Sequence, residues 1–243
     1  RAVASALGKR FVGAEVEDRR EIAEILAGYG AAAAEALDSL IQGAADDDPQ
    51  VRIASALALA GLHDPRALSV LIDRLEGYRI RGESTAWPRI VSGDLFFRVA
   101  EDLADYGSAA RPAIPTLTHL LEEVVETEYW RNRSSSIAHA LGRIGPEARP
   151  AIPGLIALMK DQPSARSSAA GAIARIGGPG AQEVVPIFVE WLRSRDEAIR
   201  IVAADALWRI ERRTDLVLPV LIELLQPGTP SIFQALTTIG AMG

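Results

Sequence analysis

The 243-residue chain has a composition that favours closely packed helices and argues against a general binder of phosphate backbones. Hydrophobic residues make up 49% of the chain but aromatic residues only 5%, so the apolar mass is Ala, Leu, Ile and Val. The net charge of -6 at pH 7 is opposite in sign to that of most nucleic-acid-binding proteins. Because cysteine is absent, disulfides, thiolate metal sites and cysteine nucleophiles are excluded.

Targeting signals are not visible in the sequence. No apolar run approaches the roughly 18–20 residues that cross a membrane, so we expect no membrane span. A chain without cysteine is compatible with either redox environment, which leaves the compartment open, and we favour a cytoplasmic location. The chain starts at Arg1 rather than Met, and we therefore expect it to be part of a longer protein.

One pattern recurs along the whole chain and predicts a series of similar helices. An anchor residue is followed four residues later by Ala, then by Leu or Ile after seven, and by an apolar residue or Tyr after ten. These offsets mark one face of a helix, and the small Ala predicts close approach of a neighbouring helix. The alanines are Ala23, Ala56, Ala100, Ala138, Ala170 and Ala204. A last copy places Phe233 at the alanine site and keeps Leu236 and Ile239.

Each of these helices is expected to be the second of a two-helix repeat. The first helices are predicted at Ala2–Phe11, Glu35–Ala45, Arg66–Gly77, Arg111–Val124, Arg149–Lys160, Glu183–Arg193 and Leu216–Gln226. Four of these helices carry proline at an equivalent position, which fits a first helical turn or a bend. These prolines are Pro115, Pro153, Pro186 and Pro219.

Helix boundaries are also indicated by single residues. Asp48-Pro49 and Asp64-Pro65 predict helix starts with Asp as the N-cap and Pro at the first helical position. Glycine predicts a left-handed helix end at Gly30, Gly107, Gly145, Gly177 and Gly240. At the corresponding place in the second repeat stands His63, which we expect to be a turn residue.

The fold expected from these elements is an all-α solenoid, an α-α superhelix of about seven two-helix repeats. The repeats are predicted at 1–30, 31–63, 64–107, 108–145, 146–177, 178–211 and 212–243. Neither helix of a repeat can bury its apolar face without neighbouring repeats, so we expect residues 1–243 to form a single domain.

The repeat also resembles a known family. Asp48-Pro-Gln-Val-Arg52 followed by Ala56 and Ala58-Leu59, with Ala-Ile-Pro openings and Arg-Ile-Gly endings, is similar to the HEAT-like repeat of the phycobilisome-lyase type. The resemblance covers essentially the whole chain, although the third and fourth copies lack the anchor Arg. It implies an armadillo-like repeat protein, and it specifies function poorly because such repeats occur in bilin lyase subunits and in scaffolds.

Catalytic and metal-binding patterns are absent from the sequence. His63, His119 and His139 are too scattered for a metal site, and none precedes Glu, as it would in the HEAT-like deoxyhypusine hydroxylases. We expect no catalytic residues, no metal and no cofactor.

Acid–Arg pairs spaced i, i+4 recur at the starts of second helices. We expect them to cap helices and to tie adjacent repeats together. The pairs are Glu15/Arg19, Asp48/Arg52 and Asp196/Arg200.

Unequal repeat lengths indicate a candidate partner site. From Gly145 to Gly177 is 32 residues, but from His63 to Gly107 is 44 and from Gly107 to Gly145 is 38. The extra residues fall between the two helices of the third and fourth repeats and are rich in aromatic residues and Arg, the usual anchors of interfaces. We name these inserted segments as the main candidate binding site: Tyr78, Arg79, Arg81, Trp87, Arg89, Tyr129, Trp130, Arg131 and Arg133.

A weaker candidate site lies on the outward face of the second helices, which usually line the concave surface of a solenoid. Positions five and nine residues past the anchor carry charged side chains of both signs, among them Glu101, Asp105 and Asp205. The groove residues that we expect to bind a ligand are His139, Arg143, Arg175, Trp208 and Arg209.

These observations favour a non-catalytic protein-interaction scaffold, or binding module, with a protein partner. Two alternatives are a bilin lyase-like subunit acting on a chromophore–protein adduct and a nucleic-acid-binding protein resembling the HEAT-like alkylpurine glycosylases. The acidic balance argues against nucleic acid. The sequence does not specify the partner or the oligomeric state.

Overall fold

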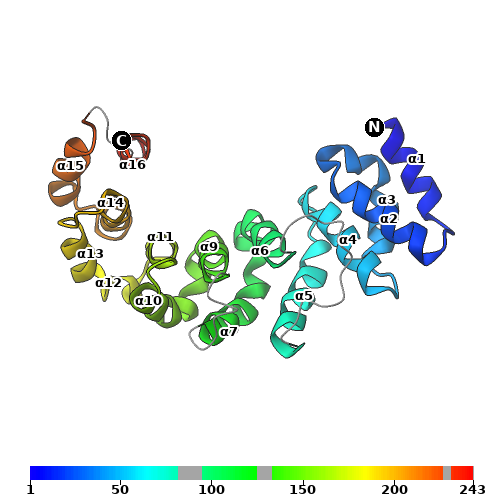
Figure 1. The fold of residues 1–243 in the computed structure, drawn as a ribbon, viewed down its shortest axis with the longest axis horizontal. Coiled ribbons are helices and arrows are strands. Elements are labelled where there is room, and N and C mark those ends of the chain that lie inside the picture. Colours follow the sequence, from blue (N-terminus) through cyan, green and yellow to red (C-terminus); the bar gives the residue numbers. More distant parts are fainter. Residues whose placement is uncertain (82–94, 125–132, 227–230, 243) are drawn as a thin grey trace. The chain divides into compact units, whose positions relative to one another are not determined.

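A computed structural model describes residues 1–81, 95–124, 133–226 and 231–242 (Figure 1). Every regular element in these residues is a helix, which confirms the predicted all-α solenoid. No helix in the same residues is long and apolar enough to cross a membrane. The helices divide into two compact units, residues 1–116 and 117–243. The single seven-repeat domain stays a prediction.

The first unit is built around α4, which is buried on almost every side and contacts α2, α3 and α5. Short 3-10 helices, labelled η, precede some first helices of the repeats. The elements are α1 (Ala2–Phe11), α2 (Val16–Ala27), η1 (Gly30–Ala36), α3 (Leu37–Gly43), α4 (Pro49–Ala60), α5 (Ala67–Arg81), α6 (Leu95–Asp105) and η2 (Gly107–Ala113).

The second unit has two rows of helices. The elements are α7 (Ile114–Val124, which begins in the first unit), α9 (Ser134–Ile144), η3 (Pro146–Ala151), α10 (Ile152–Asp161), α11 (Arg166–Ile176), α12 (Pro179–Gln182), α13 (Val185–Trp191), α14 (Glu197–Glu211), α15 (Thr214–Glu223) and α16 (Ile232–Met242). We call α9, α11, α14 and α16 the inner row; α10, α13 and α15 pack behind its last three helices (Figure 1).

Prolines explain why some first helices begin later than predicted. Pro112 lies inside η2 and Pro150 inside η3, so α7 and α10 begin at Ile114 and Ile152 instead of Arg111 and Arg149. Proline lacks the N–H donor and disfavours an α conformation in the residue before it, which shifts the helix start towards the next residues. Pro115, Pro153 and Pro186 are each the second residue of their helix, which is the first turn, as predicted. Pro219 differs because it lies in the interior of α15.

The predicted positive φ is confirmed at four of the five glycines, but only Gly145 and Gly177 directly follow the helix that they were predicted to end. Positive φ angles are found at Gly30 (53°), Gly107 (54°), Gly145 (90°) and Gly177 (64°). His63 also has a positive φ, 56°, and lies in the turn that follows α4, so it is a turn residue as predicted. The prediction for Gly240 is wrong, because this residue lies inside α16.

The alanine column is fully enclosed in both units. Its members, Ala23, Ala56, Ala100, Ala138, Ala170 and Ala204, are at most 1% exposed. The assignment of the last copy is wrong: Phe233 is 80% exposed and Leu236 51%, whereas Ala235 and Thr238 are buried. The register of α16 therefore starts at Ser231, which puts Ala235 in the alanine column.

Ionic contacts tie neighbouring repeats together in the first unit. Arg19 donates from Nε to Asp46 at 2.8 Å, and Arg20 donates from Nε to Asp48 at 2.8 Å. The hydrogen bond from Arg20 lowers the pKa of Asp48 to about 2. Asp48 also caps α4 by accepting from the backbone N–H of Gln50 and Val51.

The prediction for the acid–Arg pairs is confirmed in part. Asp48 and Asp196 cap helices, and Arg19 and Arg200 link repeats. The Glu15 side chain makes no cap hydrogen bond, and Arg52 donates to backbone carbonyls of its own repeat. Asp196 caps α14 by accepting from two backbone N–H groups of its first turn. Arg200 reaches forward to Glu223 of the next repeat at 3.0 Å.

Replacing Ala170 with Leu should lower the melting temperature, because this position is fully buried and the larger side chain has no space. We expect a loss of about 1–3 kcal/mol of stability, measured by thermal unfolding followed by circular dichroism. Glu190→Ala, an exposed change on α13, is the control. Equal melting temperatures for both variants would mean that the alanine column does not define the helix contact.

Candidate binding site

Three consecutive helices of the inner row place arginine at the same position. These arginines are Arg143 on α9, Arg175 on α11 and Arg209 on α14. Each lies nine residues past the anchor of its helix, which is Ser134, Arg166 or Arg200. All three arginines at this position are exposed, although the guanidinium of Arg175 is partly buried by its surroundings, and α11 contacts both α9 and α14. We call these residues the arginine row.

Small residues beside the arginine row bring the helices close together. Gly142 and Ala174 are buried and directly precede Arg143 and Arg175. A Cβ atom added to Gly142 would lie only 2.8 Å from the Cα of Ala172, so the backbones of α9 and α11 are in contact there. Helices that meet through such small residues approach at the short end of the usual axis separation of about 8–10 Å.

A cavity of about 480 Å³ opens beside the arginine row. Its charged wall consists of Arg143, Arg175, Arg209 and Arg212, and Trp208 is its aromatic lining residue. Between these four cations and the indole, a ligand would meet both positive charge and a flat apolar surface.

Trp208 is held in place by contacts from two elements. Its Nε1–H donates to the carbonyl oxygen of Ala241 at the end of α16, at 3.3 Å. The guanidinium carbon of Arg212 lies 4.6 Å from the centre of the indole ring, a cation–π distance. The indole is therefore a fixed part of the cavity wall.

The charges of the arginine row oppose one another. Partial burial, followed by repulsion from Arg209 and Arg143, lowers the pKa of Arg175, while Asp205 acts in the other direction. The Asp205 carboxylate accepts from Nε of Arg209 at 2.8 Å. An anionic ligand beside Arg175 would offset the repulsion from Arg209 and Arg143.

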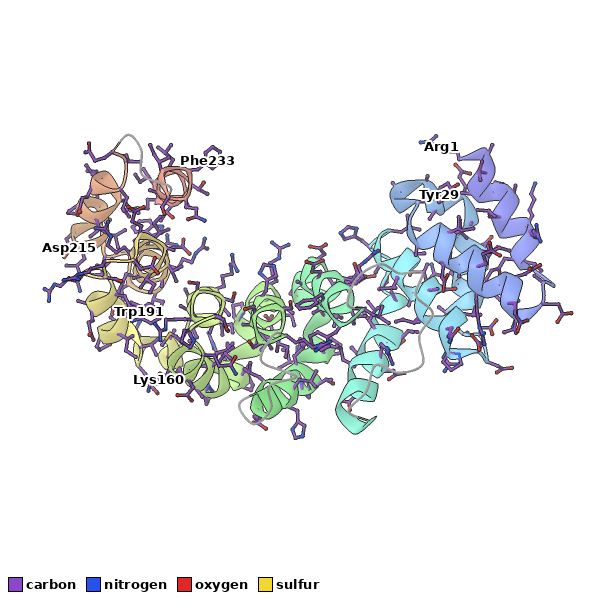
Figure 2. All side chains as sticks on the ribbon, in the orientation of Figure 1. Arg1, Tyr29, Lys160, Trp191, Asp215 and Phe233 are labelled. Carbon is purple, nitrogen blue, oxygen red and sulfur yellow. The ribbon has the colours of Figure 1, made fainter. Side chains whose placement is uncertain are left out.

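The inner row ends in an apolar face. Phe233 and Leu236 are strongly exposed, and the register from Ser231 places them two and five residues past the anchor of α16. Equivalent positions on α9 and α11 are taken by Ser136 and Ser168 at the second residue past the anchor. Figure 2 shows Phe233 on the side of α16 that faces away from α15.

The structure brings together four of the five residues predicted for the groove. Arg143, Arg175, Trp208 and Arg209 line the same cavity, while His139 is exposed on α9 and is not part of the cavity lining. Sequence reasoning missed Arg212, which adopts φ 55° after α14 where glycine is the usual residue. The signal that could have found it was the consecutive Arg212-Arg213 at a repeat end.

The inserted segments are only partly covered by the structure. Arg133 is half-buried directly before α9. Tyr78, Arg79 and Arg81 belong to the last turn of α5, but their side chains lie outside the described residues, as do Trp87, Arg89, Tyr129, Trp130 and Arg131. The binding site that we placed there stays a prediction.

No group of three or more potential metal ligands occurs within the described ranges.

Comparisons with known proteins support the repeat architecture. A family model described as HEAT repeats matches residues 2–85 and 152–239. The chain is similar to the crystal structure of an engineered protein, with 21% identity, a TM-score of 0.61, and coverage of 98% of this chain and 68% of the other. It is also similar to the complex of CpcE and CpcF of phycocyanin lyase from Nostoc sp. PCC7120, with 20% identity, a TM-score of 0.47, and coverage of 98% and 93%. No curated protein matches the sequence. At these identities the likeness concerns the fold alone.

Replacing Arg175 with Gln should raise the melting temperature at low ionic strength, because it removes the partly buried charge and its repulsion with Arg143 and Arg209. We expect a rise of roughly 1–3 °C that shrinks as salt screens the remaining charges. Arg193→Gln, an exposed change after α13, should have no such effect. A melting temperature lowered at every salt concentration would show that Arg175 stabilises the fold.

Proposed function

The chain belongs to the HEAT-repeat family, and we propose that it is a non-catalytic protein-binding module that holds its partner on the inner row of helices. The arginine row carries this proposal. Elsewhere in the chain, arginines such as Arg19 and Arg20 form ion pairs that link repeats. On the arginine row, cations gather around a cavity in a protein of net charge -6, which favours a role in binding.

A protein partner suits this surface better than a nucleic acid. The acidic balance of the chain repels a phosphate backbone, which carries a charge at every residue, more strongly than a peptide with a few spaced carboxylates, and Asp205 stands beside Arg209 on the same helix. Trp208, Phe233 and Leu236 supply apolar area of the kind that anchors protein interfaces.

The inserted segments are proposed as a second part of the partner site. They carry Trp87 beside Arg89 and Trp130 beside Arg131, and the pairing of aromatic residues with arginine is common at binding hot spots. The structure does not describe these residues, so the support is their composition and the unusual length of their repeats.

A small chromophore acid is the second candidate ligand, as the bilin lyase-like alternative requires. The cavity volume of about 480 Å³ lies within the range of small-molecule sites, and its arginines and indole would suit carboxylates on a conjugated ring system. New visible absorbance after co-expression with a bilin would favour this reading over a protein-binding module.

The test of the proposed function is affinity capture of partners from an extract of the source organism. The wild type, Arg175→Glu and Arg193→Glu would be compared by quantitative mass spectrometry. We expect a specific partner whose recovery falls about tenfold or more with Arg175→Glu, because charge reversal turns attraction into repulsion, and is unchanged with Arg193→Glu. A partner recovered equally by all three would contradict binding at the inner row. If Trp87→Ala or Trp130→Ala alone abolishes recovery, the site belongs to the inserted segments.

A further inference from the structure

The arginine row repeats once per helix, which defines the spacing of any ligand that follows it. Helices in contact lie about 8–10 Å apart, so neighbouring arginines of the row repeat at a similar interval. An extended polyproline II chain rises about 3.1 Å per residue with three residues per turn. Every third side chain of such a chain therefore returns to the same side after about 9 Å, close to the interval between helices.

Small side chains next to the arginine row leave room for the backbone of an extended ligand. Gly171 occupies the position one turn before Arg175, and a Cβ atom added there would meet nothing within 4 Å. Ser168 lies three residues before Gly171 on α11, and Ser136 takes the same place on α9. Both serines are half-buried on this face, and their hydroxyl groups could donate to or accept from a peptide backbone.

Beyond α14 the same face changes from basic to apolar. In α16 the position of the arginine row is taken by Gly240, and the two preceding positions of the face are Leu236 and Phe233. An 80% exposed Phe and a 51% exposed Leu, one turn apart, form an apolar contact surface. A ligand that follows the arginine row onto α16 would meet this pair.

We propose that the inner row binds an extended acidic segment of a partner protein. Acidic side chains at every third position would face Arg143, Arg175 and Arg209, and an apolar side chain at one end would pack against Phe233 and Leu236. Charge complementarity defines the acidic part, and the exposed pair on α16 defines the apolar end. This inference rests on the proposed function and names the chemistry of the partner.

A single strand of nucleic acid fits the same face less well. Its phosphates carry a charge at every residue, so most of them would lie between the arginines of the row, and Asp205 would repel those nearest α14. The acidic peptide needs one carboxylate per helix, which is what the arginine row offers.

The test is a fluorescence anisotropy titration with two synthetic peptides. Each is labelled with fluorescein and carries Glu at three positions spaced by Ser-Pro, with Phe three residues beyond the last Glu; the second peptide has the reverse order. We expect at least one to bind with a Kd in the micromolar range, and the affinity to fall about tenfold between 50 and 500 mM salt. Arg175→Glu should weaken binding about tenfold or more, and Phe233→Ala roughly three- to tenfold.

Matched control variants test whether binding depends on the inner row or on charge and apolar area anywhere on the surface. Arg193→Glu changes an exposed arginine outside the row, and Ile222→Ala removes a 53% exposed apolar side chain from α15; both should stay within about twofold of wild type. Peptides with Gln in place of Glu should not bind.

Three results would overturn the inference: no binding of either peptide, equal binding of the Gln peptides, or tighter Arg175-dependent binding of an oligothymidylate of equal charge. If the peptides fail but a captured partner still depends on Arg175, the binding module stands and its ligand is not an acidic segment. If the captured partner is also independent of Arg175, the proposed function fails as well.

Discussion

Close contact between helices through small side chains is the constraint on which the rest of the structure depends. The alanine column is enclosed in both units, and Gly142 lets α9 meet α11 with backbone against backbone. Larger residues at these positions would separate the helices. Since the arginine row lies one residue beyond Gly142 and Ala174, the helix spacing also determines how near its guanidinium groups come to one another. The contact between helices and the spacing of charges on the binding face therefore depend on the same residues of the repeat.

Arginine has two different roles along this chain. In the first unit, Arg19 and Arg20 meet carboxylates of the following repeat, and the shortness of these contacts matches the lowered pKa of Asp46 and Asp48. In the arginine row, the partly buried Arg175 has like charges on both sides, so its charged form is disfavoured. A fold that keeps such a group gives up some stability, and sites that do so are commonly binding sites.

The periodic features of the fold could be predicted from the sequence. The features that depend on which elements pack together in the tertiary structure could not. Offsets of four, seven and ten identified the alanine column, and helix ends at Gly145 and Gly177 followed from the preference of glycine for positive φ. The register of α16 was misread because Phe233 and Leu236 are apolar, and hydrophobicity alone does not reveal whether another helix covers them. Arg212 was missed because its left-handed conformation is unusual for a long side chain, and its contact with Trp208 depends on tertiary structure.

The link between helix contact and binding is tested most directly by comparing Gly142→Ala with Gly154→Ala. Both add one methyl group without changing charge, but the methyl group at position 142 would meet the backbone of the next helix, whereas the one at position 154 on α10, behind the inner row, would meet only the side chain of Leu121. With helical content checked by circular dichroism, we expect Gly142→Ala to weaken binding of the acidic peptide by about tenfold, because α9 moves away from α11 and Arg143 from Arg175. Gly154→Ala should leave the affinity within about twofold of wild type. Equal affinities for two folded variants would contradict the claim that the small-residue contact sets the geometry of the arginine row.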